Sequence, residues 1–180
     1  MSIAYIGIGS NIDPEDNIPA ALRLLEQSVR VVAVSTFYRT EPLGPPGSPP
    51  FINGVVKIET DIPPRKLKFD ILRKIEDALG RRRTEDKYSP RPIDLDIMVY
   101  GDLKIHEPDL RLPDPDILTR AFVAHPLFEL DPEMILPGWD AAADIAGKLP
   151  AEGMQPLIEF TSALREEFEN EQGTDRRTDP

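Results

Sequence analysis

The sequence contains no cysteine, no apolar run of membrane length and no excess of basic charge. The absence of cysteine among its 180 residues excludes disulfides and thiolate metal sites, and it fits a reducing compartment. No apolar segment approaches the roughly 20 residues that cross a bilayer, and no basic region precedes the short apolar run at the N-terminus. We therefore expect a cytoplasmic protein with no membrane partner.

The formal net charge of −11 argues against a nucleic-acid partner. Proteins that bind nucleic acid present a net basic surface, which releases counterions on binding. A small anionic ligand such as ATP remains compatible, because it responds to the local charge. Basic residues are concentrated in residues 81–91, so we expect small-molecule ligands rather than nucleic acid.

The chain has the length and composition of a folded domain. Its 11 glycines and 20 prolines make up about 17% of the residues, below the roughly 25–30% associated with low-complexity disorder. A chain of 180 residues fits one domain. We expect a single domain over residues 1–160, followed by a charged C-terminal extension over residues 161–180 whose end is disordered.

Hydrophobic patterns predict strand, helix, strand, strand, helix, strand as the order of the first hundred residues. We expect strands at residues 3–8, 31–38, 51–60 and 93–100, and helices at 14–28 and 63–79. This is the order of an α+β ferredoxin-like sandwich, a mainly antiparallel sheet with helices packed on its faces. Further along we expect a short hairpin, a helix over 119–130 broken at Pro126, and a helix over 140–148.

The last of these four strands carries two carboxylates, Asp94 and Asp96. Side chains alternate along a strand, so both aspartates face one way and their apolar neighbours face the other. Ionised carboxylates are costly to bury without a cation. Hard oxygen ligands favour Mg²⁺, which takes one or two protein carboxylates and leaves its other positions to water and phosphate oxygens. The pattern predicts a magnesium site, although two solvated side chains on an open sheet face would give the same pattern.

A basic cluster lies just before this strand, at Arg81, Arg82, Arg83, Lys87 and Arg91. Guanidinium groups suit phosphate oxygens. Alone, such a run is also typical of a solvated surface. Its adjacency to two carboxylates favours a nucleoside triphosphate as ligand.

Other local signals leave alternatives open. The Gly7-x-Gly9 pattern lacks the third glycine of a dinucleotide fingerprint and favours a tight turn after a strand. Asn53, in the middle of an apolar strand, fits either a ligand contact or a bulge.

Several stretches in consistent order resemble the 6-hydroxymethyl-7,8-dihydropterin pyrophosphokinases. They are residues 4–11, 35–40, 42–44, 51–53, 80–83, 90–97, 120–123 and 126–127. The most specific is Pro-Arg-x-Ile-Asp-Leu-Asp-Ile over residues 90–97. The resemblance covers residues 3 to 132 and implies a Mg²⁺-dependent diphosphotransferase of folate biosynthesis, which transfers pyrophosphate from ATP to 6-hydroxymethyl-7,8-dihydropterin and releases AMP.

The resemblance also implies roles for individual residues. Asp94 and Asp96 would hold two Mg²⁺ ions against the ATP phosphates, and the catalytic arginines would be Arg81, Arg83 and Arg91. The nucleotide contacts carried over are Glu76, Ile97, Asp114 and Arg120. For the pterin, Phe51 and Phe122 would sandwich the ring and Asn53 would bind its edge, helped by groups near Thr40 and Leu43. Without the resemblance, core packing would account for both phenylalanines. The implied assembly is a monomer or weak dimer.

One departure from the family pattern concerns the nucleotide site. The family usually has Leu-Pro-His-Pro where this chain has Leu-Pro-Asp-Pro at residues 112–115, so Asp114 replaces a nucleotide-contacting histidine. A carboxylate repels phosphate unless a cation intervenes. The alternative reading is therefore a related pterin- or nucleotide-binding protein with altered nucleotide choice or lost catalysis. An RNA-binding ferredoxin-like domain fits less well, because the strands lack interleaved basic and aromatic residues.

Overall fold

A computed structural model describes residues 1–42, 44–86 and 88–169. Its main sheet has the strand order β5-β1-β4-β3-β8, and β2 also pairs with β4. The strands are β1 (Ser2–Ser10), β2 (Arg30–Val34), β3 (Tyr38–Thr40), β4 (Phe51–Thr60), β5 (Asp94–Tyr100) and β8 (Met154–Pro156). All their pairings are antiparallel. A separate hairpin joins β6 (Ile105–His106) to β7 (Arg111–Leu112).

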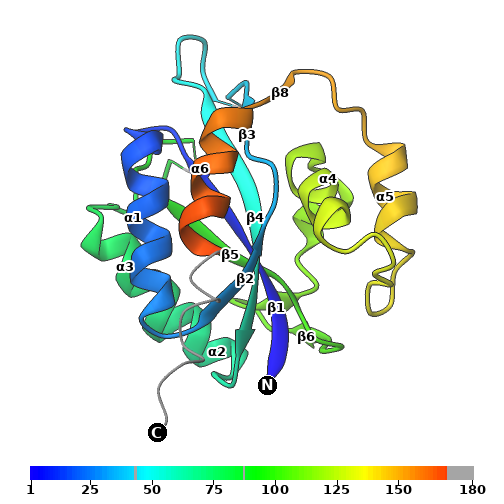
Figure 1. The fold of residues 1–180 in the computed structure, drawn as a ribbon. Coiled ribbons are helices and arrows are strands. Elements are labelled where there is room, and N and C mark those ends of the chain that lie inside the picture. The colour runs from blue at the N-terminus through cyan, green and yellow to red at the C-terminus, as the bar shows by residue number, and fades with distance from the viewer. Residues whose placement is uncertain (43, 87, 170–180) are drawn as a thin grey trace, which may run out of the picture.

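Helices cover both faces of this sheet (Figure 1). One face carries α1 (Pro14–Glu26), α6 (Ile158–Phe168) and the helical run of α2 (Pro64–Lys66), η1 (Leu67–Leu72) and α3 (Arg73–Ala78). The other face carries α4 (Ala121–Leu130) and α5 (Ala142–Lys148). Each face has its own buried apolar cluster, built from alternate residues of the same strands. The expected mainly antiparallel sheet with helices on its faces is therefore confirmed at this level.

The strand expected over residues 51–60 is found with those bounds as β4, and the other expected helices and strands are found with shifted boundaries. The strand expected over residues 31–38 divides into β2 and β3, which pair with opposite ends of β4. The expected break at Pro126 is wrong: α4 continues through this residue to Leu130, and Pro126 is buried. The expected turn at Gly7 and Gly9 is also wrong, because both glycines lie inside β1. No helix in the described part of the chain is both long and apolar enough to span a membrane.

The C-terminal part adds two elements that the sequence patterns did not predict. β8 pairs with β3 at the edge of the sheet. The helix α6 crosses residue 160, and its Leu164 and Phe168 are buried in the same cluster as α1. Arg165 donates to the carbonyl of Val34 at 2.9 Å, and the amide of Val34 donates to the carboxylate of Glu169 at 2.7 Å. These two contacts tie α6 to the end of β2 at Val34.

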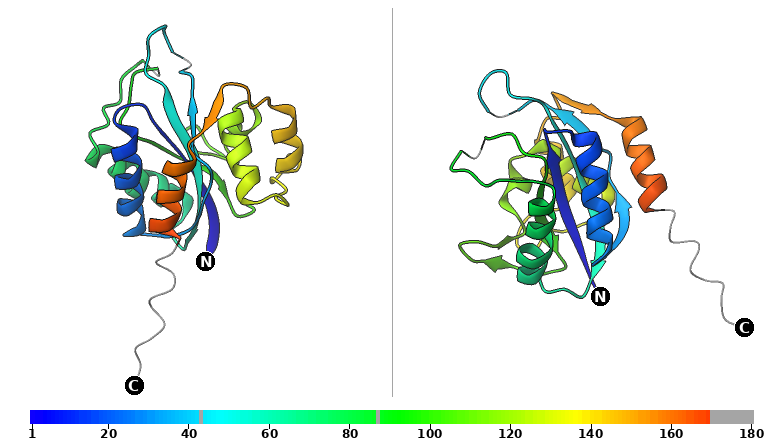
Figure 2. Two further views of the ribbon diagram at one scale, coloured as in Figure 1. Left: turned by 45° about the horizontal axis from the view of Figure 1, so that its top comes forward. Right: turned by 90° about the vertical axis from the view of Figure 1, so that its left-hand side faces the viewer.

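Two loops project from the same end of the sheet, next to the ends of β1, β4 and β5 (Figure 2). One loop precedes β4 and the other precedes β5. They approach each other, since a Cβ atom on Gly44 would lie 3.3 Å from Cβ of Tyr88. This end of the sheet, on the α4 face, is where the candidate site lies.

Candidate active site

The register of three strands places Asp94, which is predicted to bind a metal, and Asn53, which is predicted to bind the pterin, in one row across the sheet. Gly9 on β1 is paired with Asp94 on β5 and with Asn53 on β4. Residues directly opposite one another point to the same face of a sheet. Neighbouring strands lie about 4.8 Å apart, so the two side chains project side by side with a glycine between them. Because Gly9 has no side chain, it leaves room for a ligand that contacts both Asp94 and Asn53.

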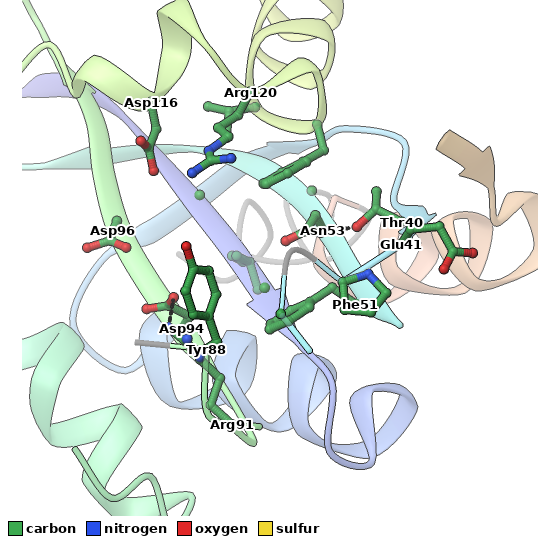
Figure 3. A pocket seen from close by; sticks show the side chains of 18 of the residues that line it. Thr40, Glu41, Phe51, Asn53, Tyr88, Arg91, Asp94, Asp96, Asp116 and Arg120 are labelled. Carbon is green, nitrogen blue, oxygen red and sulfur yellow. Dashed lines mark hydrogen bonds and ion pairs between the residues drawn. The ribbon is translucent and has the colours of Figure 1, made fainter. Parts of the chain in front are cut away.

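A cavity of about 250 Å³ opens over this row. Its lining brings together the residues predicted for the two substrates, namely Thr40, Phe51, Asn53, Arg91, Asp94, Asp96, Arg120 and Phe122. Figure 3 shows the aspartates on one side of the cavity and Thr40 and Phe51 on the other, with Asn53 between them and Arg120 across from Arg91. Anionic, cationic and aromatic groups thus converge on one space.

Asp96 is the carboxylate with the strongest need for a cation. Burial, followed by the charges of Asp94 and Asp114, raises its pKa from 3.8 to about 7. Asp94 is paired with two arginines, whereas no hydrogen bond or ion pair to the Asp96 side chain is present within the described ranges. Asp94 and Asp96 together offer carboxylate oxygens, which are the hard ligands that Mg²⁺ or a similar dication prefers. The described residues offer no group of three or more His, Cys, Asp or Glu for a metal, so water and phosphate oxygens would complete the coordination.

Arg91 is fixed at the entry to β5 by the end of β1. Its amide donates to Oδ1 of Asn11 at 2.7 Å, and Ser10 Oγ donates to the carbonyl of Pro92 at 2.6 Å. The guanidinium donates to Asp94 Oδ2 at 3.0 Å and lies 5.8 Å from the ring centroid of Phe51. The start of β5 therefore holds the positively charged guanidinium of Arg91 between the carboxylates and the ring of Phe51.

The predicted pterin contacts converge around Asn53. Its Nδ2 donates to Thr40 Oγ1 at 2.8 Å, which fixes the plane of the amide. A Cβ atom on Gly9 would lie 2.7 Å from Asn53 Oδ1, so glycine is required for this close approach. The amide oxygen is held beside the cavity floor, where it can accept from an N–H of a flat heterocycle.

Some predicted site residues do not line the cavity. Ile97 points to the opposite face of the sheet and is buried in the α1 cluster. The carboxylate of Glu76 is 2% exposed and pairs with Arg81 and Arg83. Asp114 caps the 3₁₀ helix η2 (Pro115–Leu118), where Oδ1 accepts from the amide of Asp116 at 2.9 Å. Leu43, Lys87 and the expected disordered end of the C-terminal extension lie outside the described residues.

Other lining residues were not predicted. Asp116, Glu41, Tyr88 and Met98 all contribute to the cavity wall. Asp116 and Arg120 face each other across the upper part of the cavity in Figure 3. Only Met98 carries a sequence signal, because it continues the alternation of Asp94 and Asp96. The other three reach the site through loops and η2, whose paths depend on the tertiary fold.

Comparisons with known proteins identify the family to which the chain belongs. The family model described as 7,8-dihydro-6-hydroxymethylpterin-pyrophosphokinase matches residues 5–132. A 2-amino-4-hydroxy-6-hydroxymethyldihydropteridine pyrophosphokinase of Haemophilus influenzae is 41% identical over 140 residues, covering 76% of this chain and 86% of that protein. The enzyme of the same name from Pseudomonas aeruginosa is 38% identical over 156 residues, covering 85% and 95%. The predicted family resemblance is confirmed.

The fold also matches a solved structure. The wild-type HPPK-DHPS of Plasmodium falciparum superposes with a TM-score of 0.66 at 13% identity, covering 93% of this chain. This chain spans 46% of that protein. At this identity the likeness concerns the fold alone.

Proposed function

Because the chain belongs to the 7,8-dihydro-6-hydroxymethylpterin-pyrophosphokinase family, we propose that it transfers the pyrophosphoryl group of ATP to 6-hydroxymethyl-7,8-dihydropterin. In this reaction the hydroxymethyl oxygen loses its proton to solvent and attacks the β-phosphorus, the bond from that phosphorus to the α–β bridging oxygen breaks, and AMP leaves with that oxygen. The row of Asp94, Gly9 and Asn53 is the observation that carries the proposal. It sets a cation-binding carboxylate beside an amide suited to a pterin edge.

The chain's residues would act mainly by positioning and by balancing charge. Asn53 and Thr40 would orient the edge of the pterin, and Phe51 and Phe122 would hold its faces. This orientation would direct the hydroxymethyl group towards the aspartates. Arg91 and Arg120 line the same cavity from opposite sides, where they could neutralise the phosphate oxygens.

Asp94 and Asp96 would hold Mg²⁺, which we propose binds as two ions. When bound, the metal would polarise the phosphoryl oxygens and screen their charge from the attacking oxygen. The fit rests on the oxygen-only donor pair and on the raised pKa of Asp96. Glu76, Arg81 and Arg83 would support this side of the site from α3 and the loop that follows it.

Three further features belong to the same proposal: the fold type, the cellular location and the oligomeric state. The strand order β5-β1-β4-β2 is the basis for assigning a ferredoxin-like core. A cytoplasmic location is consistent with the absence of cysteine. We also propose that the protein is a monomer or weak dimer. A binding protein without catalysis is not favoured, because relatives named as pyrophosphokinases are 38–41% identical over most of their length.

The test is AMP formation from ATP and Mg²⁺, with and without 6-hydroxymethyl-7,8-dihydropterin. Pterin-dependent AMP is expected, and Asp96→Asn should abolish it. Asp102→Asn, an exposed carboxylate in the turn after β5, is the matched control and should leave turnover unchanged. Absence of AMP together with intact pterin binding would overturn the assignment of ATP as donor.

A further inference from the structure

Arg81 is shared between two carboxylates. Its Nη1 donates to Oδ1 of Asp94 at 2.5 Å and also to Oε1 of Glu76. One guanidinium nitrogen carries two protons, so both bonds exist at once. The side chain of Arg81 is 14% exposed, which strengthens these ion pairs relative to a surface pair. One carboxylate oxygen of Asp94 is therefore already paired with the positive charge of Arg81.

Glu76 is held in place independently of Arg81. Its Oε1 accepts from the amide of Leu95 at 2.9 Å, and Arg83 donates to Oε2. The amide of Leu95 belongs to the residue between the two aspartates. Glu76 is thus bound to the backbone of β5 and stays in place when Arg81 moves.

The two aspartates differ in how accessible they are to a cation. Asp94 is paired through both oxygens, with Arg81 on one and Arg91 on the other. Asp96 has no such pair within the described residues. A divalent cation that enters the cavity can therefore bind Asp96 directly, whereas at Asp94 it must compete with an arginine.

We propose that Arg81 is the resting occupant of Asp94, and that a divalent cation reaching this carboxylate displaces Arg81, which stays bound to Glu76. Loading the site is then an exchange of cations at Asp94. Glu76 is a positioning residue, because it retains Arg81 at the edge of the cavity where incoming phosphate can meet it. This assigns Glu76 a role other than nucleotide contact, and it rests on the metal assignment made above.

The experiment is a titration of the nucleotide-free protein with Mn²⁺, followed by electron paramagnetic resonance. We expect Arg81→Gln to bind Mn²⁺ about threefold or more tightly than wild type, because it removes a competing cation from Asp94. Glu76→Gln should bind Mn²⁺ more weakly, because Arg81 then has Asp94 as its only anionic partner in the network. Asp77→Asn and Arg82→Gln, which change exposed charges nearby, should change Mn²⁺ affinity little.

A double variant separates exchange from simple loss of charge. Glu76→Gln should weaken Mn²⁺ binding more in the wild-type background than in the Arg81→Gln background. An equal effect in both backgrounds would overturn the proposal, and so would Mn²⁺ affinity in Arg81→Gln that is no higher than in wild type. Thermal unfolding of each variant checks that it is folded, and the Arg81→Gln result decides alone if Glu76→Gln does not fold.

The same titration keeps this proposal distinct from the proposed function. If Asp94→Asn and Asp96→Asn weaken Mn²⁺ binding but Arg81→Gln does not strengthen it, the metal site stands and the exchange fails. The transfer reaction is tested separately by AMP formation, which the Mn²⁺ titration does not involve.

Discussion

Replacing Asp96 by asparagine is expected to stabilise the metal-free protein at alkaline pH. In the folded state the pKa of Asp96 is raised from 3.8 to about 7, chiefly by burial and then by the charges of Asp94 and Asp114. A raised carboxylate pKa means that the folded protein binds the proton more tightly than the unfolded chain does. Stability therefore falls as the pH rises from about 4 to about 7, and above that range the full penalty of the charged form is present.

The size of the penalty follows from the shift. About 3 pKa units correspond to a ceiling of about 4 kcal/mol, at 1.36 kcal/mol per unit. For a chain of this size, 1 kcal/mol changes the Tm by about 2–4 °C. The ceiling therefore corresponds to at most about 8–16 °C in Tm. We expect Asp96→Asn to raise the Tm within this limit at pH 8, and we expect the gain to shrink as the pH approaches 4.

Thermal unfolding followed by circular dichroism in EDTA, at several pH values, measures this difference. Asp102→Asn is the control, since it removes an exposed carboxylate after the same strand. Added Mg²⁺ should stabilise the wild-type protein more than Asp96→Asn. A Tm for Asp96→Asn that equals or falls below wild type at pH 8 would refute the argument that an uncompensated charge is buried here.

Four further predictions concern the cavity and the core. Asn53→Ala removes a buried amide from the pterin side, and we expect the KM for the pterin to rise about tenfold. Gly9→Ala pushes a Cβ atom to 2.7 Å from the oxygen of that amide, so it should raise the same KM, whereas Gly147→Ala meets open space and should not. Asp114→Asn keeps the cap of η2 but removes a charge that helps to raise the pKa of Asp96, so we expect the pKa of Asp96 in the metal-free protein to fall in an NMR titration without loss of stability. Asp114→Ala should cost about 1 kcal/mol in unfolding experiments. Phe168→Ala opens a cavity in the α1 cluster, and denaturant unfolding should show a loss of about 3–5 kcal/mol.

The long strands and helices could be predicted from local patterns. β4 matched its expected range of residues 51–60, because its apolar and β-branched residues carry a strong strand signal. The alternation around Asp94 and Asp96 correctly placed both aspartates on one face, with Leu95 and Ile97 buried on the other. These features depend on spacing within one element, which the sequence contains directly.

Features that depend on tertiary pairing could not be predicted in the same way. β3 and β8 are three residues each and exist because they pair with neighbouring strands. Pro126 stays inside a helix because tertiary packing of α4 outweighs the loss of one backbone hydrogen bond. The helix α6 did carry a signal, since buried Thr161, Leu164 and Phe168 recur at helical spacing. Its many charged residues weakened that signal.

Asp114 illustrates why a departure from a family motif needs a structure before it is interpreted. From the sequence, a carboxylate in place of histidine predicts repulsion of the nucleotide. In the structure, its side chain accepts a hydrogen bond at the N-terminus of η2 and does not line the cavity. Burial raises the pKa of Asp114, and the positive charge of Lys68 acts on both Asp114 and Asp96. Asp114 therefore acts on the site mainly through Asp96, whose pKa its charge helps to raise. Its position does not displace Arg91 and Arg120, which line the cavity.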